Sequence, residues 1–466
     1  MFIILNLVEK ALDSLDQLSS NDLIQVRGQN RVISLYSIKN GILEESSRNF
    51  SKGIGTRILS NGAWGFTRTN ITDFQSIQSS IVDAQKLAKA ASSYQTRKIQ
   101  LPRSPPINDS VKLKCQKPIE NFSPNEIVKL LQSISSGVSD YLPELKNISI
   151  NLLGLTDKKF FLSSEGSRIE EEFTKIQLKI DLLLKKYDSR VPFSETYGHT
   201  GGMELFDINQ PDSIVENLVT EVKPLLEAES CPAGLFKVVI QPSLCATLLH
   251  EAIGHPLEAD LAMAGGGFNE ALIGSTVSSE LVTIYDSGSI EHGLGYFTYD
   301  DEGIKCNPTT LIENGILKSY MHDRTSASIM GTEPTGNAHA WDFSVPPMIR
   351  QTNIGMKAGD YSLEELIEDI KHGFVLDGTF GGMANSNGDF TFGFQRAFQI
   401  KQRNIEKVHL GANVSGNAIG VFKTIDGVSN KSIIRPGACG KGQFAIQGRV
   451  VPAIRCNILI GGKGGI

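Results

Sequence analysis

The stretch Lys175-Ile-Gln-Leu-Lys-Ile-Asp-Leu-Leu183 alternates apolar and polar side chains with a period of two. Ile176, Leu178, Ile180 and Leu182 therefore project from one side of an extended chain, and the polar side chains project from the other. Such alternation is typical of a β-strand with one buried and one solvated face, as in antiparallel sheets. The stretch thus predicts a sheet that packs one face on a core.

Hairpin signals lie nearer the N-terminus. Asn40-Gly41 follows strand-like residues 32–39, and Asn61-Gly62 separates strand-like residues 53–59 from residues 63–69. Asn-Gly between apolar runs is the strongest short hairpin signal, because both residues tolerate a positive φ. Further strand-like runs cover residues 147–153, 158–163 and 235–240.

Helical spacing of apolar residues is confined to a few segments. Ile77, Ile81, Ala84 and Ala88 fall on one stripe, which predicts a helix. Four other helices are predicted. One covers residues 125–138, and a second contains Ile214, Leu218 and Val222. A third begins after Ser243 as its N-cap, and a fourth begins at the capping-box pair Ser362 and Glu365.

Strands that outnumber segregated helices predict an α+β fold. We expect a mixed N-terminal α/β region with antiparallel hairpins, then a large β-rich C-terminal domain with few helices. A proline-rich polar stretch at residues 101–124 is typical of a linker. The predicted division is an N-terminal α+β subdomain at 1–100, the linker, a second α+β subdomain at 125–229, and a β-rich metal-binding catalytic domain at 230–466.

The composition excludes some classes of function. A formal net charge of -6 disfavours nucleic acid as the main partner, because phosphate binding requires a basic surface. The six cysteines contain no C-x-x-C pair, and no apolar stretch is long enough to span a bilayer. Leu5, Val8, Leu12 and Leu15 recur at helical spacing, so the N-terminus resembles an amphipathic helix and not a secretory signal. We therefore expect a cytoplasmic protein.

One motif carries chemistry: Leu248-Leu-His-Glu-Ala-Ile-Gly-His-Pro-Leu-Glu-Ala-Asp260. His250 and His255 are five residues apart, which on a regular helix separates them by about 140°. Gly254 weakens the helix and Pro256 disfavours the helical conformation for the residue before it. A bulge or π-type turn at this point would bring both imidazoles to the same side.

Two neutral imidazoles are good zinc ligands, and a catalytic site adds a third protein ligand and an open position for water. Glu251 projects roughly 100° from His250 around the helix, so it could act as general base on a metal-bound water without binding the metal. The alternative interpretation is a buried helix whose histidines bond backbone carbonyls, because short motifs often match by chance.

Cys439 is the leading candidate for the third ligand. It lies in the glycine-rich segment Pro436-Gly-Ala-Cys-Gly-Lys-Gly-Gln-Phe444, where the backbone can approach a ligand and Lys441 would favour a thiolate. A free loop thiol is an equal alternative. Glu258 and Asp260 are closer in sequence, but acidic residues after a proline are more often solvated.

Two other segments have a functional and a structural interpretation. Ala264 to Phe268 is glycine-rich and close to His255, which suggests a mobile flap or an ordinary turn. His322-Asp323-Arg324 is interpreted as a surface salt bridge and not as a catalytic group.

Together these segments resemble the TldD/PmbA family of metalloproteases, in its TldD-type, motif-bearing branch. The residues that carry the resemblance are HEAIGHPLEAD (250–260), GIGTRILSNGAWGF (53–66), DDEGIKCNPTTLIENGILKSYMHDRTSA (300–327), PTGNAHA (334–340) and GACGKGQF (437–444). The last segment is one residue shorter after its cysteine than the family's usual C-G-K-x-G-Q.

The resemblance implies a zinc ion bound by His250, His255 and Cys439, with Glu251 as the catalytic glutamate. It also implies a substrate that is an unfolded protein or peptide, and a homodimer or a heterodimer with a PmbA-like paralogue. We therefore predict a zinc-dependent metallopeptidase of the HExxxH type. The alternative is a non-enzymatic adaptor subunit of a protease complex, whose metal is structural or absent.

Overall fold

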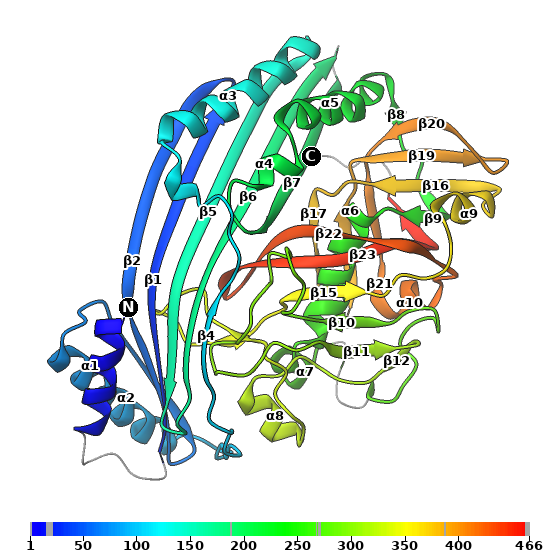
Figure 1. Cartoon of the computed structure of the whole chain (residues 1–466). Helices are drawn as coiled ribbons and strands as arrows, with labels where there is room; N and C mark the ends of the chain where they lie inside the picture. Colours follow the sequence, from blue (N-terminus) through cyan, green and yellow to red (C-terminus); the bar gives the residue numbers. More distant parts are fainter. Residues whose placement is uncertain are drawn as a thin grey trace.

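The computed structural model describes residues 2–14, 22–186, 189–266, 268, 272–385 and 388–461. Within these residues the strands form a seven-stranded sheet, a 14-stranded sheet and a two-stranded sheet, with helices set apart from them. Figure 1 shows the long strands of the first sheet curving around the C-terminal part of the chain. The predicted α+β fold is confirmed.

The N-terminal sheet has the order β3-β2-β1-β5-β6-β4, and β7 also pairs with β6. Antiparallel pairing of β1 with β5 runs from Gln25↔Ser163 to Lys39↔Ser149, so strands before and after the predicted linker build one sheet. The predicted linker itself contributes β4, which pairs in parallel with β6. The strands are β1 (Leu23–Lys39), β2 (Ile42–Ser60), β3 (Ala63–Thr69), β4 (Asn108–Lys112), β5 (Leu145–Ser163), β6 (Arg168–Lys186) and β7 (Ser189–Thr200).

Helices cover this sheet in two groups. α3 (Pro124–Tyr141) and α5 (Pro211–Val222) pack over one end of the long strands, and α1 (Phe2–Asp13) and α2 (Phe74–Ser92) lie near the other end (Figure 1). Ser123 and Glu126 form a capping box at the start of α3. Leu15, predicted to continue the first helix, lies outside the described residues. The shorter helical segments here are η1 (Ile119–Asn121), α4 (Leu205–Ile208) and η2 (Lys223–Glu227).

The C-terminal sheet is organised by its last strand, β23 (Gln443–Ile460). β23 pairs with β15, β9, β21 and β22, so it runs through the middle of the domain. The other strands of this sheet are β8 (Glu229–Ser230), β9 (Gly234–Ile240), β10 (Ile284–Asp286), β11 (Thr309–Glu313), β12 (Ile316–Leu317), β15 (Asn353–Met356), β16 (His372–Asp377), β17 (Gly381–Ala384), β18 (Asp389–Gly393), β19 (Arg396–Lys401), β20 (Asn404–Leu410), β21 (Asn413–Asn417) and β22 (Gly427–Lys441). β13 (Ala338–His339) and β14 (Met348–Ile349) form the two-stranded sheet.

Few helices accompany the C-terminal sheet. α6 (Pro242–Leu249) is buried in its core, and the predicted capping box of Ser362 and Glu365 is confirmed at α9. α9 covers Leu363–Glu368, and the other helices of this part of the chain are α7 (Ala259–Met263), α8 (Arg324–Met330) and α10 (Ala418–Lys423). Among the described residues, no helix is both long and apolar enough to cross a membrane.

Buried ion pairs join the two large sheets. The carboxylate of Asp301 lies 2.8 Å from Lys159 Nζ on β5 and 3.5 Å from Arg27 Nη1 on β1. Arg57 of β2 pairs with Glu302 in the same way. The predicted surface salt bridge at residues 322–324 is wrong, because Arg324 is buried and its partner is the distant Glu165.

Candidate metal centre

The helix that carries the motif changes its pitch at His250. α6 ends at Leu249, a π-turn covers His250–Gly254, and a short 3₁₀ turn, η4, covers His255–Leu257. Of the two predicted possibilities, a bulge or a π-type turn, the structure has the π-type turn. A π-turn places residues five apart on one side, so the ring centroids of His250 and His255 lie 4.6 Å from each other.

The start of this helix differs from the prediction. The residue at the N-cap is Gln241, and Ser243 does not cap the helix. The Ser243 hydroxyl instead contacts the Asp377 carboxylate and accepts a hydrogen bond from the Gly378 amide. The contact anchors the motif helix to the end of β16, because Asp377 is the last residue of that strand.

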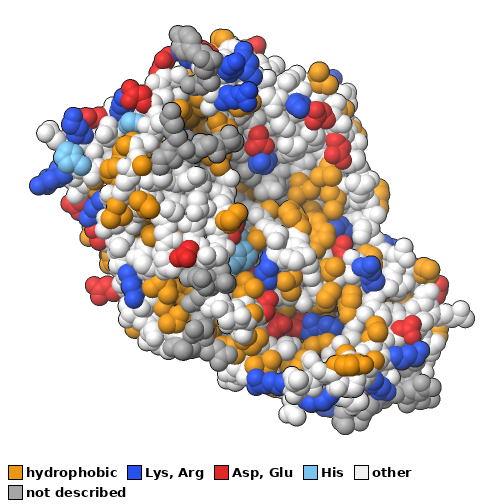
Figure 2. Space-filling model, turned by 180° about the vertical axis from the view of Figure 1, so that it is seen from behind, with side chains coloured by type: hydrophobic (Ala, Val, Ile, Leu, Met, Phe, Trp, Pro, Cys, Tyr) orange, Lys and Arg blue, Asp and Glu red, His pale blue; other side chains and the backbone are white. Residues whose placement is uncertain are grey.

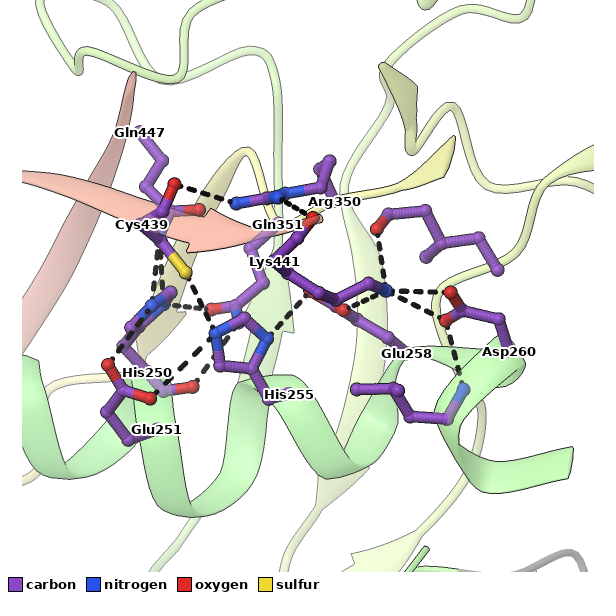
Figure 3. A network of polar contacts seen from close by, with 12 residues as sticks. His250, Glu251, His255, Glu258, Asp260, Arg350, Gln351, Cys439, Lys441 and Gln447 are labelled. Atoms are coloured by element: carbon purple, nitrogen blue, oxygen red, sulfur yellow. Dashed lines mark hydrogen bonds and ion pairs between the residues drawn. The ribbon is translucent and has the colours of Figure 1, made fainter. Parts of the chain in front are cut away.

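Cys439 reaches the histidines from a strand and not from a loop. It lies near the end of β22, opposite Ala445 of β23, and Gly442 makes the tight turn between the strands with a φ of 64°. Its Sγ lies 3.0 Å from His255 Nε2. One ligand atom from each of His250, His255 and Cys439 lies within 4.8 Å of the others, as Figure 3 shows. The fold thus brings all three predicted ligands together.

Two glutamine side chains hold the ring of His250. Gln351 Oε1 lies 2.7 Å from His250 Nδ1 and its amide nitrogen donates to the His250 carbonyl, so Oε1 accepts a hydrogen from Nδ1. Gln447 Nε2 lies 3.1 Å from both ring nitrogens, which places the amide over the ring face. Burial lowers the pKa of His250 well below its usual value. The ring is therefore neutral, with an in-plane lone pair on Nε2.

His255 is held from its other side by a carboxylate. Its Nδ1 lies 3.2 Å from Glu258 Oε1, and Glu258 in turn pairs with Lys441, whose Nζ also lies 2.8 Å from Asp260. Glu258 is fully buried, so the expectation that it is solvated is wrong. Lys441 was expected to favour a Cys439 thiolate, but its ammonium group binds these carboxylates and the Ile349 carbonyl.

The protonation of His255 follows from these contacts. Burial by itself lowers the pKa of His255, but the contacts with Cys439 and Glu258 outweigh burial and raise it to about 10. Burial likewise acts to raise the pKa of Glu258, and its contacts with His255 and Lys441 hold it below the usual value. A cation that binds at Nε2 would displace the His255 proton, as metal ions generally do at ligating groups.

Glu251 lies beside both imidazoles and is partly buried. Its carboxylate oxygens are 3.7 Å from His250 Nε2 and 3.9 Å from His255 Nε2. Burial raises the pKa of Glu251 above its usual value, although the positive charges of His255 and Arg449 oppose this effect. A carboxylate with a raised pKa beside a metal position is suited to accept and return a proton.

These donors fit a divalent zinc ion. Two imidazole nitrogens and one thiolate sulfur are a common zinc set, and three protein ligands leave a coordination position open. The second ring nitrogen of His250 is hydrogen-bonded to Gln351, and that of His255 is in an ion-pair contact with Glu258 at 3.2 Å without a hydrogen bond. Metal-bound histidines usually have an oxygen partner in this position. These outer partners were not predicted. Glu258 belongs to the motif, whereas nothing in the sequence around Gln351 or Gln447 indicates their role.

A pocket of about 360 Å³ opens beside His255, the one of the three donors that lines it. Glu251, His255 and Lys441 line one side, and Ala264 and Gly266 line another. Figure 2 shows the reverse face of the molecule, where hydrophobic side chains gather over the middle. Part of the predicted flap, at Gly267, lies outside the described residues.

Comparison with known proteins gives consistent matches along the chain. Residues 233–460 match the PmbA/TldA metallopeptidase C-terminal domain, and residues 25–93 match the PmbA/TldA metallopeptidase domain 1. A metalloprotease of Methanocaldococcus jannaschii is 34% identical over 424 residues, which cover 89% of this chain and 90% of the relative. A zinc metalloprotease TldD homolog of Saccharolobus solfataricus is 30% identical over 406 residues, or 86% of this chain and 87% of the relative.

The fold is also found in a solved structure. TldE from Thermococcus kodakarensis superposes with a TM-score of 0.78 at 19% sequence identity, covering 98% of this chain and 100% of that protein. Identity at this level shows a common fold alone. The sequence matches carry the assignment further: this chain belongs to the TldD/PmbA family of metallopeptidases.

Proposed function

We propose that this chain is a TldD-type zinc metallopeptidase that hydrolyses peptide bonds in unfolded proteins or peptides. One observation carries the proposal: two imidazole nitrogens and a thiol sulfur converge within 4.8 Å, beside a carboxylate and an open pocket. The name of the S. solfataricus relative supports zinc as the metal.

Each side chain has a role in this mechanism. His250 Nε2, His255 Nε2 and Cys439 Sγ would bind the ion, and Gln351 and Glu258 would keep the two rings in position. Bound zinc would polarise the peptide carbonyl and make a water molecule more acidic. Glu251 would accept the proton of the attacking water and then donate it to the leaving amine.

The surroundings of the site suit an extended peptide. Among the described residues β22 pairs with no strand other than β23. Tyr361 bonds its start at Ser429, and Arg350 bonds the carbonyl oxygens of Cys439 and Lys441, so the second edge is left without another strand along residues 432–438. Strand addition at such an edge gives affinity through backbone hydrogen bonds, with little demand on sequence. That mode of binding is appropriate for unfolded chains of varied sequence.

The adaptor alternative requires a closed metal site or none. Within the described residues only His250, His255 and Cys439 converge as candidate metal ligands. The Glu251 carboxylate is 3.7 Å from His250 Nε2 and 3.9 Å from His255 Nε2. A structural zinc site normally has four protein ligands. Three converging donors beside a pocket therefore support the enzyme over the adaptor.

Metal analysis combined with a peptidase assay tests the proposal. We expect the purified full chain to contain zinc and to cleave reduced, alkylated and denatured protein in a chelator-sensitive way. Glu251→Ala should keep the metal and lose cleavage by roughly 10²–10⁴-fold, whereas His250→Ala should lose both. Glu216→Ala, on the exposed face of α5, is the matched control. Normal cleavage by Glu251→Ala would refute the mechanism.

We also propose that the chain works as a dimer, either with a second copy or with a PmbA-like paralogue. The family fold that it has in common with TldE is compatible with both arrangements. Light scattering during size-exclusion chromatography, with and without a co-expressed paralogue, distinguishes them. A monomer under both conditions would contradict the proposal.

A further inference from the structure

A second cavity lies between the N-terminal sheet and the C-terminal domain. The space open to the centres of water-sized spheres is about 50 Å³, and on that measure one water molecule needs about 10–15 Å³, so the cavity holds a small group of atoms. Arg31 of β1 and Lys175 of β6 reach it from one side, and His339 and Arg350 reach it from the other. It is thus a small chamber at the junction of the two large sheets.

The chamber contains buried nitrogen atoms that have no hydrogen-bond partner among the described residues. These atoms are Lys175 Nζ, Arg31 Nη1, Arg350 Nε and both ring nitrogens of His339. All four residues are at least nine-tenths buried, at 2%, 6%, 2% and 7% exposure for Lys175, Arg31, Arg350 and His339. Buried donors are rarely left unpaired, because the lost hydration costs about 1–3 kcal/mol per group.

Aromatic rings form much of the wall around these donors. Lys175 Nζ lies 3.3 Å from the ring centroid of Phe297, and the guanidinium carbon of Arg31 lies 4.4 Å from that of Trp341. A ring face attracts a cation, but it does not replace an oxygen acceptor for the remaining N–H groups. The walls therefore suit a ligand that is partly hydrocarbon and has its oxygen atoms at one end.

The side chains at the chamber leave an excess of positive charge, which favours an anionic ligand. Arg31 pairs with Asp157, whereas the single carboxylate of Asp301 is shared by Lys159 and Arg27. Lys175 has no ion pair among the described residues, and burial lowers its pKa well below the usual value, against the opposing effect of Glu171. One anionic group would compensate this lysine and keep it charged.

We propose that this chamber is a binding site for a carboxylate group, with Lys175 as its counter-ion. A carboxylate offers about four acceptor sites for the unpaired donors of Lys175, Arg31, His339 and Arg350. Its negative charge would compensate Lys175, which like Arg350 has no ion pair among the described residues, and its small size suits a volume of about 50 Å³. The group would be a small free carboxylate or the C-terminal carboxylate of a peptide.

The site is separate from the candidate metal centre but adjoins it. Arg350 also donates to the carbonyl oxygen of Cys439, and Gln351, which lines the chamber, holds the ring of His250. Gln443 and Ala445, next to the turn of the β22–β23 hairpin, line it too. A bound carboxylate would therefore lie behind the hairpin that carries Cys439.

Thermal denaturation with acetate, and with acetamide as its uncharged analogue, tests the site without any assay of peptidase activity. At constant ionic strength, acetate at a hundredfold excess over its Kd should raise the Tm of the full chain by roughly 2–5 °C, and acetamide should not. Lys175→Met should abolish the shift, whereas Lys179→Met, an exposed lysine on the same strand, should retain it. An equal effect of acetamide on the wild type, or an unchanged shift in Lys175→Met, would overturn the proposal.

A second comparison distinguishes the two sources of the carboxylate. Binding of one unstructured peptide is measured with a free C-terminus and with a C-terminal amide, in Glu251→Ala so that cleavage does not interfere. If the peptide terminus is the ligand, the free acid should bind roughly tenfold or more tightly, and Lys175→Met should remove the difference. Equal affinities together with the acetate shift would assign the site to a free small carboxylate.

Discussion

The Glu258 carboxylate lies 3.2 Å from Nδ1 of His255, whose Nε2 is 3.0 Å from the Cys439 sulfur. One ring nitrogen is thus held by a buried anion while the other faces the candidate metal position. A carboxylate in this place fixes the orientation of a ligating imidazole and increases its basicity. Lys441 compensates the charge of Glu258, which is why the anion tolerates full burial.

Replacing Glu258 by glutamine should weaken zinc binding without removing a ligand. Glu258→Gln keeps the size and one acceptor oxygen but loses the charge that increases the basicity of His255. We expect roughly a 10–100-fold lower affinity for zinc, measured by competition with a chromophoric chelator. Asp260→Asn is the control, because Asp260 binds the same Lys441 and has no recorded contact with His255. Equal losses in both variants would show that only the charge around Lys441 matters.

Cobalt substitution should reveal whether the sulfur is a ligand. With Co²⁺ in place of zinc, a bound Cys439 thiolate gives a sulfur-to-cobalt charge-transfer band in the near ultraviolet. We expect the band in the wild type and in Cys115→Ser, whose thiol lies outside the cluster. Cys439→Ser should lack it and bind the metal more weakly. Persistence of the band in Cys439→Ser would mean that another group completes the site.

The sequence predicted those parts of the fold in which apolar periodicity is regular. Ile176, Leu178, Ile180 and Leu182 are all at most 3% exposed, as their alternation indicates. The first half of β1 was missed, because both of its faces are buried. Ile24 and Val26 pack in an apolar core on one face, whereas Arg27 and Arg31 on the other face bind buried carboxylates, so polar character does not mark a solvated face there.

The candidate metal centre likewise has features that local sequence predicts and features that it does not. The five-residue spacing, with Gly254 and Pro256, was sufficient to predict a bulge or a π-type turn from local stereochemistry, and the structure has the π-turn. The contacts of Gln351 and Gln447 with His250 span 101 and 197 residues of sequence. No local pattern encodes such pairs, since they depend on how β15, β23 and α6 pack. Cys439 was selected from its glycine-rich context, although it lies on a strand beside a turn.

Gly254 should be required for the position of His250 as well as for the π-turn. A methyl group at residue 254 would overlap the Gln351 amide, which accepts the hydrogen bond from His250 Nδ1. Gly254→Ala should therefore lower zinc affinity by roughly tenfold or more, together with a lower Tm. Gly420→Ala is a matched glycine-to-alanine change in α10, where the added methyl meets only the Asn417 Cβ at 3.9 Å. It should leave zinc affinity unchanged, and a similar loss there would contradict the argument.

Asp301 should be a main determinant of stability against acid. Burial acts to raise the pKa of Asp301, but the charges of Lys159 and Arg27 outweigh burial and hold it below the usual value. A depressed carboxyl pKa stabilises the fold fully above the unfolded value of about 4, and this stability is lost as the pH falls through the folded pKa. Asp301→Asn should therefore lower the free energy of unfolding by about 3–5 kcal/mol near pH 7, because it leaves buried cations unpaired.

Urea denaturation of both proteins between pH 7 and pH 3 provides the measurement. The difference between wild type and Asp301→Asn should stay constant down to about pH 5 and shrink below about pH 4, since Asp301 of the unfolded chain then begins to bind a proton while the folded carboxylate stays charged. Asp83→Asn is the control: Asp83 pairs with Lys86 at the surface, and its loss should change stability by no more than about 0.5 kcal/mol. A difference that instead grows as the pH falls would mean that Asp301 is destabilised in its charged form, and that Lys159 and Arg27 do not compensate its burial.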